Sequence, residues 1–104
     1  MCFRTKKAIP MIDLTAALYN FERRTGVSAK EILGTSRRAE IVAARQLYWL
    51  ILRDKVGVSW TRIADFCDVT HPSVMSGVKN AREKLEVGDK LVCDMWELVE
   101  DMEV

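Results

Sequence analysis

Apolar side chains recur at intervals of three and four residues along most of the chain, which is the period of an amphipathic helix. The spacing predicts helices near residues 13–25, 28–33, 38–56, 59–66, 70–86 and 89–103. Glycines close several of these runs, because glycine readily takes the left-handed conformation in which helices often end. The sequence shows no alternating strand pattern, repeat or low-complexity segment. We therefore expect an all-α domain of about six helices, with residues 1–11 as a flexible lead-in.

The apolar stripe of each predicted helix indicates which side chains should be buried. In the 38–56 helix the stripe consists of Ile41, Ala44, Tyr48, Ile51 and Leu52. In the 70–86 helix it consists of Val74, Val78, Ala81 and Leu85. The last helix carries the apolar residues Leu91, Met95, Leu98, Val99 and Met102, and an exposed apolar face there would be a docking surface. Trp49, Trp60 and Trp96 are scattered over three helices, so we expect them to pack within the domain rather than stack on unpaired bases.

The segment from Ser59 to Val74 has the pattern of two helices joined by a tight turn. Ser59 and Thr70 are good N-cap residues, because each hydroxyl can accept a hydrogen bond from a backbone N–H that the helix leaves unpaired. Pro72 falls in the first turn after Thr70, where its missing N–H costs nothing. Apolar contacts would come from Ile63, Phe66, Val69, Val74 and Val78. The pattern predicts a helix-turn-helix, in which the start of the second helix enters the major groove of DNA.

A chain of 104 residues is suited to a single domain whose core needs no disulfide bonds. Its 49% apolar and 30% charged residues are ordinary for a soluble folded protein. No apolar run is long enough to cross a membrane or to form the core of a secretion signal. Cys2, Cys67 and Cys93 are odd in number and widely spaced, which favours free thiols in a reducing compartment. We expect a cytoplasmic protein.

The net charge of +1 hides an uneven distribution. Residues 1–82 carry 14 Lys and Arg against 7 Asp and Glu, whereas residues 83–104 carry 2 against 8. A basic body with an acidic final helix is compatible with a surface that faces DNA, although solvated charged faces on ordinary helices would give the same totals.

Candidate catalytic and metal-binding groups are sparse. Cys67 and His71 are four residues apart, but His71 is the only histidine and no second pair of ligands accompanies it. The sequence lacks a carboxylate cluster, an acid that could orient His71 toward Ser73, and the G-x-x-x-x-G-K-[ST] loop that cradles ATP phosphates. We expect no enzyme activity, no metal, no cofactor and no ATP binding.

Several marks follow one another in a fixed order over residues 12–98. They are Gly26-Val27, Ile32-Leu33-Gly34, Ser36-Arg37-Arg38, Ala44-Arg45-Gln46, Ser59 with Ile63 and Phe66, and Thr70-His71-Pro72-Ser73-Val74. In this order and spacing the chain resembles the C-terminal DNA-binding domain of the bacterial replication initiator DnaA, a helix-turn-helix domain of the Trp-repressor-like type. The last mark stands at the place of that family's Asp-His-Thr-Thr-Val signature.

The resemblance implies that DNA is read in both grooves. By its place in the motif, Arg37 resembles an arginine that enters the minor groove, whose negative potential is strongest where A·T-rich DNA makes it narrow. His71 and Ser73 match residues of the signature helix in the major groove, where each can donate or accept a hydrogen bond at a base edge. Contacts to the DNA backbone are implied for Arg38, Arg45 and Gln46. The full implied interface consists of Arg37, Arg38, Arg45, Gln46, Ser59, Thr70, His71, Pro72, Ser73, Lys79 and Asn80.

The chain departs from the family pattern at the base-reading edge. Thr70 replaces an aspartate that would accept a hydrogen bond from cytosine, and Pro72 replaces a threonine. The turn before Thr70 is one residue shorter, and Asp68 within it would repel phosphate. Asn80 stands where the family usually has a lysine. We therefore expect double-stranded DNA binding with a different preferred sequence or with weakened specificity.

Two hypotheses from different classes follow from these residues. The first is a standalone DNA-binding domain that acts in replication initiation or its regulation, or as a small transcriptional regulator. The second is a protein-interaction module that kept the fold and lost the DNA contacts, docking a replication or regulatory protein through the acidic 89–103 helix.

Overall fold

The computed structural model describes residues 11–102, and the side chains from residue 14 onward. These residues are helical and contain no strand, in agreement with the predicted all-α fold. The elements are α1 (Met11–Thr25), α2 (Ala29–Ile32), α3 (Ala39–Ile51), the π-helical turn η2 (Leu52–Val56), α4 (Trp60–Cys67), α5 (His71–Val87) and α6 (Lys90–Val99). Helix α1 begins at Met11, one residue inside the predicted lead-in, whose other residues lie outside the described range.

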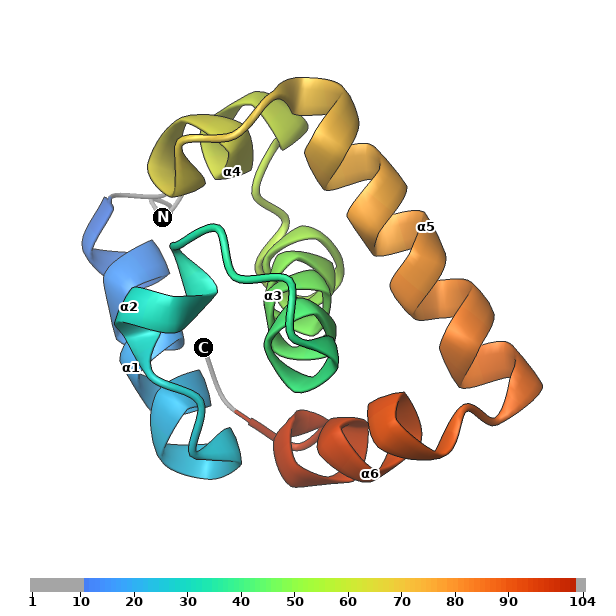
Figure 1. Cartoon of the computed structure of the whole chain (residues 1–104). Coiled ribbons are helices and arrows are strands. Elements are labelled where there is room, and N and C mark those ends of the chain that lie inside the picture. Colours follow the sequence, from blue (N-terminus) through green and yellow to red (C-terminus); the bar gives the residue numbers. More distant parts are fainter. Residues whose placement is uncertain (1–10, 103–104) are drawn as a thin grey trace, which may run out of the picture.

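Helix α3 lies near the middle of the molecule, with α1, α4, α5 and α6 around it (Figure 1). The predicted stripe on α3 is buried, but so are residues on its other sides, among them Leu47, Trp49 and Leu50. A helix that is apolar around most of its circumference is one that other helices enclose. The single stripe expected from the sequence was therefore too narrow for this element.

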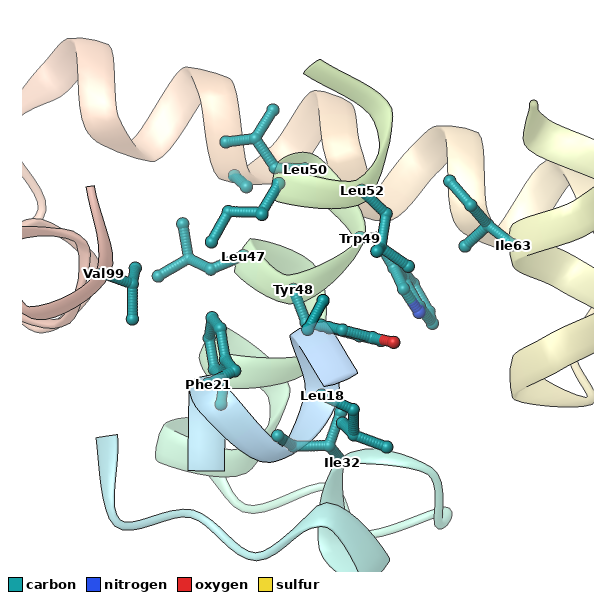
Figure 2. Close-up of a cluster of buried hydrophobic side chains, with 14 of the residues drawn as sticks. Leu18, Phe21, Ile32, Leu47, Tyr48, Trp49, Leu50, Leu52, Ile63 and Val99 are labelled. Carbon is teal, nitrogen blue, oxygen red and sulfur yellow. The ribbon is translucent and has the colours of Figure 1, made fainter. Parts of the chain in front are cut away.

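Tyr48 joins α3 to α1. Its ring packs edge-to-face on Phe21, with centroids 5.9 Å apart, and its hydroxyl donates a hydrogen bond of 2.8 Å to the carbonyl of Leu14 (Figure 2). Burial raises the pKa of Tyr48, so the phenol stays protonated and remains a donor. This contact fixes α1 against α3.

Helix α6 buries part of the apolar set that the sequence places on it. Val92, Met95 and Val99 point into the core, whereas Leu91 and Leu98 are 40% and 49% exposed. Each residue turns an α-helix by about 100°, so the line through 92, 95 and 99 leaves 91 and 98 on a flank. Leu91 and Leu98 each lie one position before a buried residue, so periodicity alone does not separate them from the buried face.

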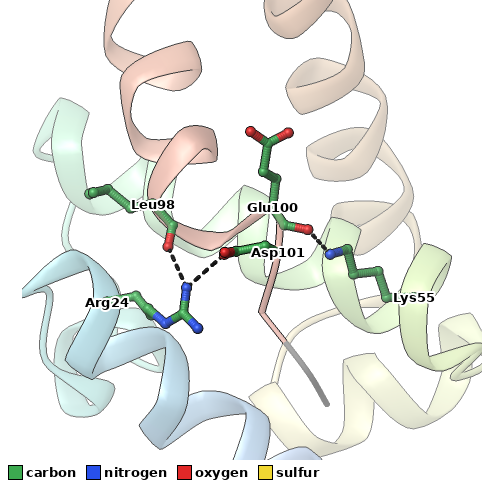
Figure 3. Close-up of polar contacts among 5 residues, drawn as sticks. All are labelled: Arg24, Lys55, Leu98, Glu100 and Asp101. Carbon is green, nitrogen blue, oxygen red and sulfur yellow. Dashed lines mark hydrogen bonds and ion pairs between the residues drawn. The ribbon is translucent and has the colours of Figure 1, made fainter.

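Two cations from other elements hold the carboxyl end of α6 (Figure 3). Nη1 of Arg24 on α1 donates to the Leu98 carbonyl at 3.2 Å and to Oδ1 of Asp101 at 2.8 Å. Lys55 of η2 donates to the carbonyl of Glu100. Cations are favourable here, because the last carbonyls of a helix carry partial negative charge.

The Arg24–Asp101 contact should make stability depend on pH. The hydrogen bond from Arg24 lowers the pKa of Asp101 below its ordinary value of 3.8. The carboxylate therefore stabilises the fold above that value, and its contribution is lost as pH falls through the lower native pKa. We expect Asp101→Asn to lower Tm at pH 7, with the difference from wild type shrinking as the pH falls below 3.8 and the carboxyl group becomes protonated. Glu97→Gln on the same helix is the control; a difference unchanged between pH 7 and pH 2 would contradict the prediction.

Trp49 holds both helices of the helix-turn-helix against α3. Its ring lies on the side of α3 that faces α4 (Figure 2), where Nε1 donates to Sγ of Cys67 at 3.3 Å. On α5, a Cβ added to Gly77 would lie 2.5 Å from Cε3 and Cζ3 of the Trp49 ring. Only glycine lets α5 approach the indole this closely, so Trp49 sets the distance of both α4 and α5 from the core.

We expect Gly77→Ala to destabilise the fold although alanine favours helices. The overpacking cost of about 1–3 kcal/mol should exceed the gain in helix propensity of about 1 kcal/mol. Chemical denaturation of Gly77→Ala, Trp49→Leu and the double variant measures this, with Ser76→Ala, an exposed neighbour, as the control. The two changes should be non-additive, because a leucine in place of Trp49 is smaller and makes room for the methyl group. Additive losses would show that the Trp49–Gly77 contact does not limit the packing.

Candidate DNA interface

The corner between α4 and α5 is closed by backbone hydrogen bonds and by two N-caps. Ser59 Oγ accepts from the Arg62 N–H at 3.2 Å at the start of α4. At its end Asp68 has φ 56°, and the Val69 N–H donates to the Ala64 carbonyl at 3.0 Å. This is a helix end of the kind that usually uses glycine, and aspartate is among the few other residues that tolerate it. Asp68 therefore shapes the short turn, in addition to bringing negative charge to the corner.

The first turn of α5 carries four of the predicted interface residues. Thr70 is the N-cap, as predicted, and its hydroxyl accepts from the Ser73 N–H at 3.3 Å. The same hydroxyl lies 2.7 Å from Ser73 Oγ, so the two side chains share a hydrogen bond. His71 and Pro72 are exposed, and neither side chain makes a hydrogen bond or ion pair with another residue in the described part of the chain. The polar groups of Thr70 and Ser73 are thus partly engaged with each other.

Further along α5, the side opposite the core is exposed. Val74, Gly77, Val78 and Ala81 face α3 and the other helices. The predicted residues Lys79 and Asn80 lie on the exposed side. So do Met75 and Ser76, which the motif comparison did not single out. The helical period predicts that both are exposed, because each lies about 100° around the helix axis from its buried neighbour at position 74 or 77.

The connector, defined as residues 33–38, carries Arg37 and Arg38 between α2 and α3. Arg37 is exposed. Arg38 is the N-cap of α3, and its Nη2 lies 2.5 Å from Oε2 of Glu40. The backbone N–H of Glu40 itself, and then the Arg38 guanidinium, lower the pKa of that carboxyl. Part of the positive charge predicted to meet phosphate is therefore balanced within the protein.

Arg45 has a structural role that the motif did not reveal. Its Nε donates to the Ile32 carbonyl at 2.9 Å, Nη1 to that of Ser36 at 3.0 Å and Nη2 to that of Glu31 at 3.1 Å. Burial lowers the pKa of Arg45, yet an arginine stays charged in this range. The guanidinium joins the end of α2 to the connector, and the phosphate contact remains a prediction.

Two further side chains of the α3–η2 rod support the helix-turn-helix. Half-buried Gln46, predicted to bind the DNA backbone, packs beside Gly77: its Cγ is 3.3 Å from where a Cβ on that glycine would lie. Arg53 lies over the ring of Trp60, 4.4 Å from its centroid, and donates to the Val58 carbonyl at 3.3 Å. Trp60 packs against the core, as does Trp96, so the expectation that these rings pack is met.

Loss of the Arg45 contacts should loosen the connector. We expect Arg45→Ala to lower the free energy of unfolding by about 1.5–3 kcal/mol, the range for hydrogen bonds to a charged group. Amide hydrogen exchange should speed up at residues 33–38 more than in α1. The free energy of unfolding of Arg45→Lys should lie between those of wild type and Arg45→Ala, because an ammonium group cannot bind three carbonyls at once as the planar guanidinium does. An exchange rate that rises equally throughout the chain would show that Arg45 does not stabilise the connector more than the rest of the fold.

Other chemistry has little support in residues 11–102. No group of three or more His, Cys, Asp or Glu side chains there could hold a metal ion, and no helix of that range is long and apolar enough to cross a membrane. Cys67 is buried, and burial raises the pKa of its thiol to about 11. Cys67 therefore remains a thiol at neutral pH and serves as the acceptor for Trp49.

The fold and corner define a helix-turn-helix domain. The family profile described as "Bacterial dnaA protein helix-turn-helix" matches residues 21–81, more than half of the chain. The chain therefore belongs to this family, as the sequence marks indicated. Every predicted interface residue lies within the matched range, whereas α6 lies beyond it.

Curated relatives also match part of the chain. The chain is 30% identical over 77 residues to "Chromosomal replication initiator protein DnaA 1" of Chlamydia trachomatis, covering 74% of this chain and 17% of that protein. It is 33% identical over 63 residues to "Chromosomal replication initiator protein DnaA" of Leptospira biflexa, covering 61% and 14%. The protein of the same name from Pseudothermotoga lettingae is 33% identical over 67 residues, covering 64% and 15%. No solved structure matches.

Proposed function

We propose that this protein binds double-stranded DNA through the first half of α5 and the connector, and that it acts in replication initiation or its regulation. The observation that supports this most directly is the exposed first turn of α5 on a helix-turn-helix of the DnaA family. The relatives are replication initiators by name. Since the chain spans only 14–17% of those relatives, it is proposed to share their DNA contact and not their other activities.

In the major groove, the N-terminal turn of α5 would meet the base edges. His71 is exposed there, and a histidine can donate or accept a hydrogen bond at a base. Unpaired N–H groups at the N-termini of α4 and α5 would bind phosphates beside Ser59 and Thr70. Lys79 and Asn80, on the same exposed side of α5, would meet the groove wall farther along.

In the minor groove, Arg37 would be the reading residue. It is exposed, with no hydrogen bond or ion pair to the rest of the described chain, so no internal contact has to be broken before it binds. Arg38 would contact phosphate only in competition with Glu40. Arg45 would act on this loop chiefly as a positioning residue, through its three carbonyl contacts.

The preferred DNA sequence should differ from that of the relatives. The shared hydrogen bond between Thr70 and Ser73 leaves fewer polar groups free for bases, and Pro72 offers no donor. Asp65 and Asp68 are exposed near the corner, and they would weaken attraction to phosphate. We expect modest affinity with steep salt dependence.

Fluorescence anisotropy with labelled duplexes tests the proposal. The duplexes are an initiator-type box, a scrambled control and the best sequence selected from a random pool, each measured across a salt series. Arg37→Ala should weaken binding to all three by about tenfold or more, since it removes a charge that contacts DNA. His71→Ala should reduce the preference for the selected sequence. Arg23→Ala, which removes an exposed arginine of α1, is the matched control and should leave both the affinity and the sequence preference unchanged.

The salt series also separates two roles for Arg45. A phosphate contact predicts that Arg45→Ala reduces the slope of log K against log salt by about one, whereas a positioning role leaves the slope unchanged and lowers affinity. Absence of binding to every duplex at low salt would refute DNA binding. The protein-interaction hypothesis would then stand, with Leu91, Leu98 and the acidic residues of α6 as the surface to test.

A further inference from the structure

Met75 is a large apolar side chain on the part of α5 that the proposed interface uses. It is 44% exposed and lies in the second turn of the helix. Its neighbours on the helix surface are the residues three and four positions away, His71, Pro72 and Lys79, all of which are exposed. Met75 and Pro72 together form an apolar edge beside a histidine and a lysine that are proposed to face DNA.

The core does not account for this apolar edge. Val74 and Val78 are 0% and 1% exposed and fill the space against the other helices, whereas 44% of Met75 stays open to solvent. Nor does the edge join a larger patch on α5, where the other exposed large apolar residue is Val87 at the far end of the helix. A small apolar contact within a polar binding surface suits a small apolar group on the ligand.

The major groove offers one such group. Base edges there present hydrogen-bond donors and acceptors, and the apolar exception is the methyl at C5 of thymine. Cytosine methylated at C5 presents the same group at the same position of the ring. The thioether of methionine is flexible and polarizable, so it can adapt to a methyl group whose place is set by the DNA.

We propose that Met75, with Pro72, recognises the C5-methyl group of a pyrimidine in the major groove. The inference rests on the proposed DNA binding and concerns its sequence specificity. The protein would identify a base less by hydrogen bonds and more by an apolar contact with the methyl group. The engaged hydroxyls of Thr70 and Ser73 are consistent with this shift, because fewer polar groups remain to identify the base. Neither Met75 nor its neighbours must move from the core for the contact to form.

The test replaces thymine by deoxyuridine, one position at a time, in the duplex selected from a random pool. Uracil differs from thymine only by the missing methyl group. At one position or two adjacent ones, we expect wild-type affinity to fall about 3- to 10-fold, the size of one buried methyl contact. In Met75→Ala, affinity for the thymine duplex should fall by a similar factor, and the thymine–uracil difference should disappear.

Val87→Ala is the matched control, because it shortens another exposed apolar side chain of the same helix away from the proposed groove contact. It should retain the full thymine–uracil difference. At the same position, cytosine and 5-methylcytosine duplexes show whether a methylated cytosine also satisfies the site. Thermal unfolding checks that Met75→Ala is folded, which its exposure leads us to expect.

The outcomes separate this inference from the function beneath it. Tight binding with equal affinity for thymine and uracil at every position would overturn methyl recognition and leave DNA binding intact. A thymine–uracil difference that persists in Met75→Ala would assign the methyl contact to another residue and would also overturn the inference. Absence of binding to any duplex would refute the proposed function itself.

Discussion

The contact between Trp49 and its partners on α4 and α5 is the constraint on which the orientation of the helix-turn-helix depends. The indole meets the Cys67 thiol on one helix and the bare backbone of Gly77 on the other. Neither helix could move along or away from α3 without losing one of these contacts. The surface proposed to meet DNA is therefore placed by a side chain that is itself buried.

The same rod of α3 and η2 supports each part of the proposed interface at intervals of four residues. Arg45 holds the connector, Trp49 holds the two helices of the corner, and Arg53 holds the residues that lead into α4. Because residues four apart lie on one side of a helix, a single face of this rod holds both elements that are proposed to enter the grooves of DNA. Tyr48, one residue before Trp49, ties the rod to α1.

Local signals in the sequence were sufficient for the helices and their beginnings. The predicted caps Ser59 and Thr70 each accept the expected backbone N–H, and Ser28 and Asp89 cap α2 and α6 in the same way, because capping depends on residues within one turn. The roles of Arg45 and Gly77 were not predictable, because their partners lie 9 to 31 residues away in the chain and their contacts depend on how closely the helices pack. A motif match also cannot show that Thr70 and Ser73 bind each other. The buried face of α6 was not predictable for a related reason: apolar residues occur on more than one side of that helix, and only packing decides between them.

The π-helical turn η2 affects the orientation of the helix-turn-helix relative to the rod. Here the Val58 N–H reaches back to the carbonyl of Leu52, and Gly57 at φ 82° ends the rod. A π turn accommodates one more residue than an α turn, so it absorbs an insertion without disturbing the helix before it. Removal of one residue from 52–56 would restore α-helical pairing and rotate the exit of the chain by about 100° around the rod. The length of this segment, more than its composition, thus sets the direction in which α4, and α5 after it, leave the end of the rod.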